Sequence, residues 1–87
     1  MAHSVSARKR VRQNARRHER NRARKTRIKT EIHKLDAAID AGQKDRAAAQ
    51  LRLAARTIDK IAATGTIHRN KAARLKSRLA RRVNKAK

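Results

Sequence analysis

Two glycines divide this chain of 87 residues into three segments, and each segment repeats apolar residues at helical spacing. Gly42 and Gly65 each follow a periodic run, which is where a helix that ends in the left-handed conformation places its glycine. The chain contains no proline, so no other residue interrupts the pattern strongly. The sequence therefore predicts three helices, over residues 6–41, 44–64 and 67–85.

The apolar residues of each segment fall on one side of its helix. Most of them are separated by three or four residues, a spacing that returns to the same face of an α-helix. In chain order they are Ile28, Ile32, Leu35 and Ile39; Ala47, Leu51, Ala54, Ile58, Ile61 and Ala62; and Ala72, Leu75, Leu79, Val83 and Ala86. Three stripes and two short turns predict an all-α fold, an antiparallel three-helix bundle, with Thr66 as the N-cap of its third helix. Six of the larger side chains are expected to share the core: Ile32, Leu35, Leu51, Ile58, Leu75 and Leu79.

The supply of apolar side chains also favours helices over a sheet. Val, Ile and Leu total fourteen, there is no Phe, Tyr or Trp, and eighteen Ala complete the apolar set. Alanine and long unbranched side chains favour helices, whereas strands are enriched in β-branched and aromatic residues. A single domain of this size buries a modest share of its chain, so its stability is expected to be marginal without a partner.

Residues 7–29 form a basic run that carries twelve Lys or Arg side chains and one acid, Glu19. On a helix these cations point in every direction, and like charges four residues apart cost roughly 0.2 to 0.5 kcal/mol per pair. The first helix, roughly 54 Å long, is also much longer than the second, at about 30 Å, so its basic N-terminal half projects beyond the bundle. We expect this half to fray in isolation and to become helical when phosphates surround it.

The third segment carries a second cluster of cations without any acid, whereas the middle one has five basic residues and two acids, Asp45 and Asp59. A formal net charge of +21 repels itself in a compact monomer, so a polyanion is the expected partner. Seventeen of the 27 cations are Arg, which can bind phosphate through two parallel hydrogen bonds. Because the chain has no aromatic ring to stack on unpaired bases, we expect it to recognise the backbone and shape of folded RNA.

The sequence offers little for catalysis, metal binding or membrane insertion. There is no Cys, no Gly-rich phosphate loop and no catalytic triad, so we expect neither an enzyme nor a cofactor. The four histidines lie fifteen or more residues apart and predict no metal site: His3, His18, His33 and His68. His68, beside Arg69 and Asn70, can either contact phosphate or ribose or cap the third helix without a ligand. The absence of a secretory signal and of a long apolar run predicts a soluble intracellular protein.

Three other interpretations of the basic run compete with RNA binding. One is a DNA-binding basic-region dimer, but the apolar seam behind the run stops after about two heptads, at Gly42, and a stable zipper needs about three or four. Another is a membrane-surface helix, which would need an apolar face, yet Val5 and Val11 are the only large apolar residues of the N-terminal 27 apart from Met1. The third is a disordered tail or localisation signal. The second basic cluster, in the third segment, argues against this interpretation.

The final third of the chain, GTIHRNKAARLKSRLARRVNK over residues 65–85, resembles the bacterial-type small-subunit ribosomal protein S-twenty family. That family has a Gly-x-Ile-His-x-Asn-Lys-Ala-Ala-Arg pattern near its C-terminus. The matching residues, in order, are Gly65, Ile67, His68, Asn70, Lys71, Ala72, Ala73 and Arg74. The Ser-Ala-x-Lys-Arg stretch at residues 6–10 and the AAIDAGQKDRA stretch at residues 37–47 match as well.

The resemblance covers essentially the whole chain and implies one RNA-binding helical domain over residues 1–87. It implies a three-helix bundle bound to 16S ribosomal RNA as an early assembly protein of the small subunit, cytoplasmic and ribosome-bound in a bacterium or an organelle. Neither a membrane nor a small-molecule substrate is an expected partner. Twenty residues are the predicted RNA-binding residues: Ser6, Arg8, Lys9, Arg10, Arg12, Arg16, Arg17, Arg20, Arg22, Arg24, Arg27, His68, Arg69, Asn70, Lys71, Arg74, Lys76, Arg78, Arg81 and Arg82.

Overall fold

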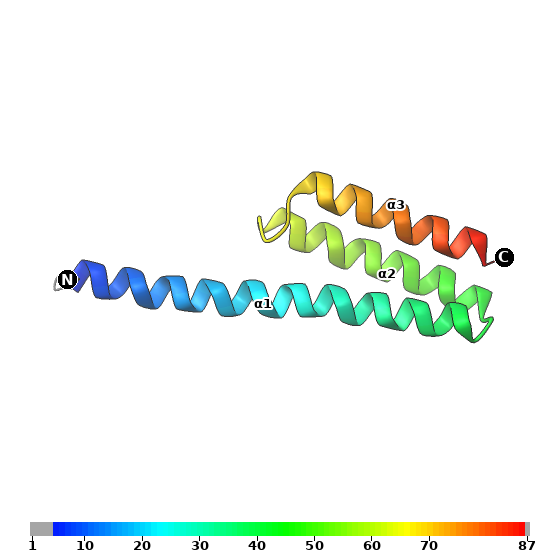
Figure 1. The fold of residues 1–87 in the computed structure, drawn as a ribbon, viewed down its shortest axis with the longest axis horizontal. Helices are drawn as coiled ribbons and strands as arrows, with labels where there is room; N and C mark the ends of the chain where they lie inside the picture. The colour runs from blue at the N-terminus through cyan, green and yellow to red at the C-terminus, as the bar shows by residue number, and fades with distance from the viewer. Residues whose placement is uncertain (1–4, 87) are drawn as a thin grey trace.

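The computed structural model describes residues 5–86, and three α-helices account for nearly all of them. Helix α1 covers Val5–Asp40, α2 covers Lys44–Ala63 and α3 covers Arg69–Lys85. Helix α2 runs antiparallel to both of the others and packs against each, while α1 extends far beyond the two shorter helices at its N-terminal end (Figure 1). The described residues contain no strand, and the predicted all-α fold with a long first helix is confirmed.

Both glycines end a helix in the left-handed conformation, as predicted. Gly42 has a φ of 70° and Gly65 a φ of 82°. At the first turn the Gly42 N–H donates to the Ile39 carbonyl at 3.0 Å and the Gln43 N–H donates to the Ala38 carbonyl at 3.1 Å. This pair of bonds is the Schellman motif, which satisfies carbonyls at the end of α1 and reverses the chain into α2.

The prediction that Thr66 is the N-cap of α3 is wrong. His68 occupies that position, and its Nδ1 accepts a hydrogen bond from the Asn70 backbone N–H at 3.1 Å. Ile67 is buried, so the chain first runs inward to place this side chain in the core and the helix begins only at Arg69. Thr66 instead directs its hydroxyl toward α1. The other helix ends lie within one residue of the predicted positions.

The three apolar stripes meet in one narrow core. Leu35, Ile58 and Leu79, one from each helix, are the largest fully buried side chains. The other three predicted core residues are partly buried against the same cluster: Ile32, Leu51 and Leu75. They lie at the edges of their stripes, because three thin helices enclose little more than one row of side chains. Buried alanines between the large residues let the helices approach closely.

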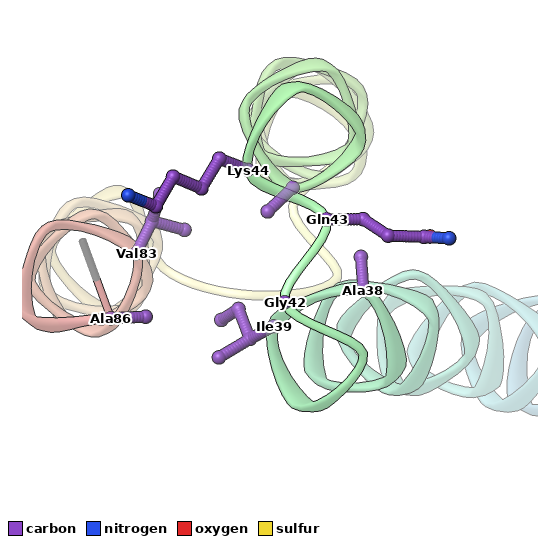
Figure 2. A pocket seen from close by; sticks show the side chains of 8 residues that line it. Ala38, Ile39, Gly42, Gln43, Lys44, Val83 and Ala86 are labelled. Atoms are coloured by element: carbon purple, nitrogen blue, oxygen red, sulfur yellow. The ribbon is translucent and has the colours of Figure 1, made fainter.

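A small apolar cavity lies where the α1–α2 turn meets the C-terminal end of α3 (Figure 2). Its volume is about 40 Å³, and its lining includes Ile39, Ala47 and Val83. In Figure 2 the Lys44 side chain extends toward Val83, whereas Gln43 points away from the cavity. Sites for small molecules usually enclose about 300 Å³ or more, so this cavity is a packing gap at the end of the bundle.

Candidate nucleic-acid interface

The N-terminal part of α1 forms a basic arm, defined here as residues 5–20. Every residue from 8 to 20 is exposed, and these thirteen residues carry seven cations and one acid, Glu19. Their side chains form no hydrogen bond or ion pair with the described residues of α2 or α3. The helix continues through the whole basic run without a break. The expectation that this part frays in the free protein stays a prediction.

A cluster of hydrogen bonds joins α1 to the α2–α3 turn at the end of the arm. The Thr66 Oγ1 atom lies 3.2 Å from Asn21 Oδ1 and accepts from the Arg24 guanidinium at 3.4 Å. It also lies 2.9 Å from the Thr64 Oγ1 atom, whose hydroxyl is 2.6 Å from the Ile61 carbonyl. Each threonine hydroxyl has one proton. Because Thr66 donates its proton to Asn21 and Thr64 donates to Ile61, neither has a proton left for a hydrogen bond between the two threonines. Arg24 thus contacts the α2–α3 turn, and the arm lies on the N-terminal side of this contact.

Two predicted binding residues of α3 form ion pairs with the neighbouring helices. The Lys76 Nζ atom lies 2.7 Å from Asp59 Oδ1 on α2. The Arg82 guanidinium lies 2.6 Å from Asp36 Oδ1 on α1, and this pair links the first helix directly to the third. Both cations keep part of their surface exposed, so their role as phosphate ligands stays a prediction beside the role that the structure shows.

The remaining cations of α3 stay on its surface. Lys71, Arg74 and Arg78 share one hollow with the partly buried Leu75. Arg69, Asn70 and Arg81 are also exposed. These residues are available to a partner without breaking any described contact.

His68 serves as the helix cap, which was one of the two alternatives that the sequence left open. Because its Nδ1 accepts the Asn70 N–H, a neutral ring carries its proton on Nε2. The ring is exposed, so this N–H is available as a donor to a ligand. Contact with phosphate or ribose stays a prediction.

The structure adds two cations to the predicted surface. One hollow along α1 is lined by residues that recur every three or four positions: His18, Asn21, Arg22, Lys25, Thr26 and Lys29. Lys25 and Lys29 belong to the basic run but were not among the predicted RNA-binding residues. Their spacing of three and seven residues from Arg22 was the signal that places them on the same face.

The acids of the chain are concentrated away from the arm. Glu19 is the only one of six that lies there, and Glu31, Asp36 and Asp59 form ion pairs within the bundle. Over residues 5–86 no three His, Cys, Asp or Glu side chains are grouped in a way that could hold a metal ion; His3 lies outside the described residues. None of the three helices is both long and apolar enough to cross a membrane, as far as the chain is described.

Comparison with known proteins shows similarity over almost the whole chain. The family model described as Ribosomal protein S20 matches residues 2–84. The Small ribosomal subunit protein bS20 of Corynebacterium jeikeium is 48% identical over 85 residues, which cover 98% of each chain. The proteins of the same name from Syntrophobacter fumaroxidans and Psychrobacter sp. are 48% and 51% identical, over 97% and 90% of this chain and 98% and 89% of their own. The matched range includes the basic arm, both turns and nearly all of α3.

Proposed function

This chain belongs to the ribosomal protein S20 family, and from that premise we propose that it binds folded 16S ribosomal RNA through α1 and α3 and helps the small subunit to assemble. As a member of the family it is a structural, non-enzymatic constituent of the small ribosomal subunit, and its place is the ribosome in the cytoplasm. The observation that carries the RNA-binding proposal is the basic arm. Its seven cations lie within the thirteen exposed residues 8–20, form no ion pair with the described part of the bundle and are suited to a polyanion.

The phosphates of an RNA partner supply the negative charge that the cations of the arm lack within their own chain. Arg16 and Arg20, one turn apart, repel each other in the free helix, and an RNA phosphate between them turns that repulsion into two charge-assisted contacts. Each phosphate that is neutralised releases counterions, so affinity falls as salt rises. With about eight such contacts, we expect the logarithm of the affinity to fall with the logarithm of salt at a slope of roughly −6 to −7.

Two observations weigh against the DNA-binding zipper and the membrane-surface helix. The apolar seam of α1 is covered by the chain's own helices, since Ile28, Leu35 and Ala38 are buried in the bundle, and no seam is left for a zipper partner. Val5 and Val11, the exposed aliphatic residues of the arm, stand among cations and form no apolar face for a lipid surface.

The test compares nucleic acids of equal length at equal salt. The full chain is titrated with a folded 16S ribosomal RNA fragment and with duplex DNA, and cell extract is fractionated to ask whether the protein cosediments with small subunits. We expect tighter binding to the RNA fragment, because shape and the 2′-hydroxyl distinguish RNA from DNA without base reading. Equal affinity for the RNA fragment and the duplex DNA, or a protein that does not cosediment with small subunits, would contradict the proposal.

A further inference from the structure

The ion pair between Asp36 and Arg82 marks the sides on which α1 and α3 face each other. On α1, Lys29, Lys25 and Arg22 come 7, 11 and 14 residues before Asp36. At 3.6 residues per turn, each of them lies within about 40° of Asp36 around the helix axis. The cations that line the hollow on α1 therefore lie on the side of the helix that points toward α3.

Helix α3 presents a matching row. Arg78, Leu75 and Lys71 come 4, 7 and 11 residues before Arg82 and lie within about 40° of it. Because α1 and α3 run in the same direction, residues equally far from the ion pair lie at similar heights (Figure 1). Lys71 thus stands at the level of Lys25, roughly 16 Å from the pair at about 1.5 Å per residue.

Between the ion pair and the arm, the two rows hold cations without an acid among the described residues. The cations of the two rows repel each other, which favours separation of the helices. They are Arg22, Lys25 and Lys29 on α1, and Lys71 and Arg78 on α3. Figure 1 shows α3 closest to α1 near its C-terminal end, where the ion pair lies, and farther away at its start. The pair therefore links α1 to α3 at the end where the two helices converge.

We propose that Asp36 and Arg82 form a positioning pair, which sets the angle between α1 and α3 so that one RNA segment contacts both basic rows at once. The inference rests on the proposed function. The side chains of Arg82 and Asp36 are 49% and 40% exposed, and a pair this exposed contributes little to folding. Its main effect falls on the relative orientation of the rows, and so on binding. Asp36, an acid in a protein that binds a polyanion, thereby strengthens binding.

The direction in which one substitution changes the affinity for RNA distinguishes this positioning role from a simple effect of charge. Removal of an acid lowers the repulsion of RNA and, without any positioning role, strengthens binding. Asp40 supplies the matched control, since it lies one turn after Asp36 on the same helix, is exposed and forms no ion pair among the described residues. Asp36→Asn and Asp40→Asn make the same change of charge, and only the first breaks the pair.

The experiment measures the affinity of the full chain for the folded 16S fragment over a salt series. We expect Asp40→Asn to bind as tightly as the parent protein or slightly more tightly. Asp36→Asn should bind about three- to fivefold more weakly, with a shallower salt slope, because the α3 row then makes fewer phosphate contacts. A purely structural defect lowers the folded fraction and weakens binding by the same factor at every salt concentration.

A charge exchange completes the test. The double variant Asp36→Arg with Arg82→Asp keeps the net charge and restores the pair, so both affinity and slope should recover relative to Asp36→Asn. The positioning role is wrong if Asp36→Asn binds as tightly as Asp40→Asn, if it weakens with an unchanged slope, or if the exchange recovers nothing. A parent protein whose affinity for the fragment does not depend on salt would instead contradict the proposed function itself.

Discussion

The two halves of α1 share one continuous helix but are stabilised in different ways. Residues 21–40 bury Ile28, Leu35 and Ala38 against the other helices and form ion pairs through Glu31 and Asp36. Residues 8–20 bury nothing and concentrate charge of one sign. The first pattern stabilises the helix within the chain, and the second leaves stabilisation to a partner. The comparison shows how a single helix separates folding from binding along its length.

Apolar burial and like-charge repulsion differ in size as well as in sign. Full burial of an aliphatic side chain such as Leu35 contributes about 1.5 to 3 kcal/mol. Each like-charge pair along the basic run costs only roughly 0.2 to 0.5 kcal/mol, but no burial in the arm offsets it. The arm is therefore the part of the helix whose order depends most on the surroundings.

Amide exchange on the free protein gives the largest expected difference between the halves. An amide that opens only on global unfolding is protected by the whole stability, about 5 kcal/mol for a small domain, which is on the order of a thousandfold or more. We expect such protection near Leu35 and almost none from Arg8 to Arg20, with protection of the arm appearing when the 16S fragment is added. Strong protection of the arm without RNA would contradict the comparison.

Truncation of a core side chain should have the next largest effect. Leu35→Ala removes a fully buried side chain and should lower the free energy of unfolding by about 2 to 5 kcal/mol, comparable to the whole stability of the domain. Val11→Ala, at a residue that is 62% exposed in the arm, is the matched aliphatic control and should leave melting nearly unchanged. Thermal melting followed by circular dichroism measures both, and equal shifts would show that the arm packs on the bundle.

Loss of charge from the arm should weaken binding without changing the stability of the bundle. Replacement of Arg16, Arg17 and Arg20 by Gln should flatten the salt slope by about two to three, on the order of a hundredfold in affinity at 0.1 M salt. The control is the pair Arg52 and Arg56 on the outer side of α2, whose replacement should do little. If that pair proves as damaging as the triple variant, the arm is not the main binding element.

The smallest effect is expected at the turn that joins the arm to the bundle. Gly65 has a φ of 82°, and a Cβ added there would meet no atom within 4 Å. The cost of Gly65→Ala is therefore backbone strain alone, about 1 to 2 kcal/mol in the free energy of unfolding. Gly42→Ala, in the turn at the far end of α1, should cost about the same. A much larger loss at Gly65 would indicate that the Thr66 cluster couples the turn to the arm.

Several features of the molecule follow from local sequence alone. The spacing of Ile28, Leu35 and Ile39 identifies a helix face because helical periodicity depends only on residues within a few turns. Gly42 and Gly65 mark both turns because only glycine adopts a positive φ at little cost. The arm can be recognised in the same way, since no apolar stripe accompanies its cations.

The contacts between helices needed the tertiary structure. Thr66 has the chemistry of an N-cap, but burial of Ile67 moves the start of α3 and gives the cap to His68. The pairing of Asp36 with Arg82 depends on how far α1 and α3 are rotated and shifted relative to each other. Packing of the core sets the rotation of each helix about its own axis, and no local pattern encodes it. The sequence by itself determined which residues are helical and which are cationic, whereas packing decided which cations the fold uses for itself and which it leaves to a partner.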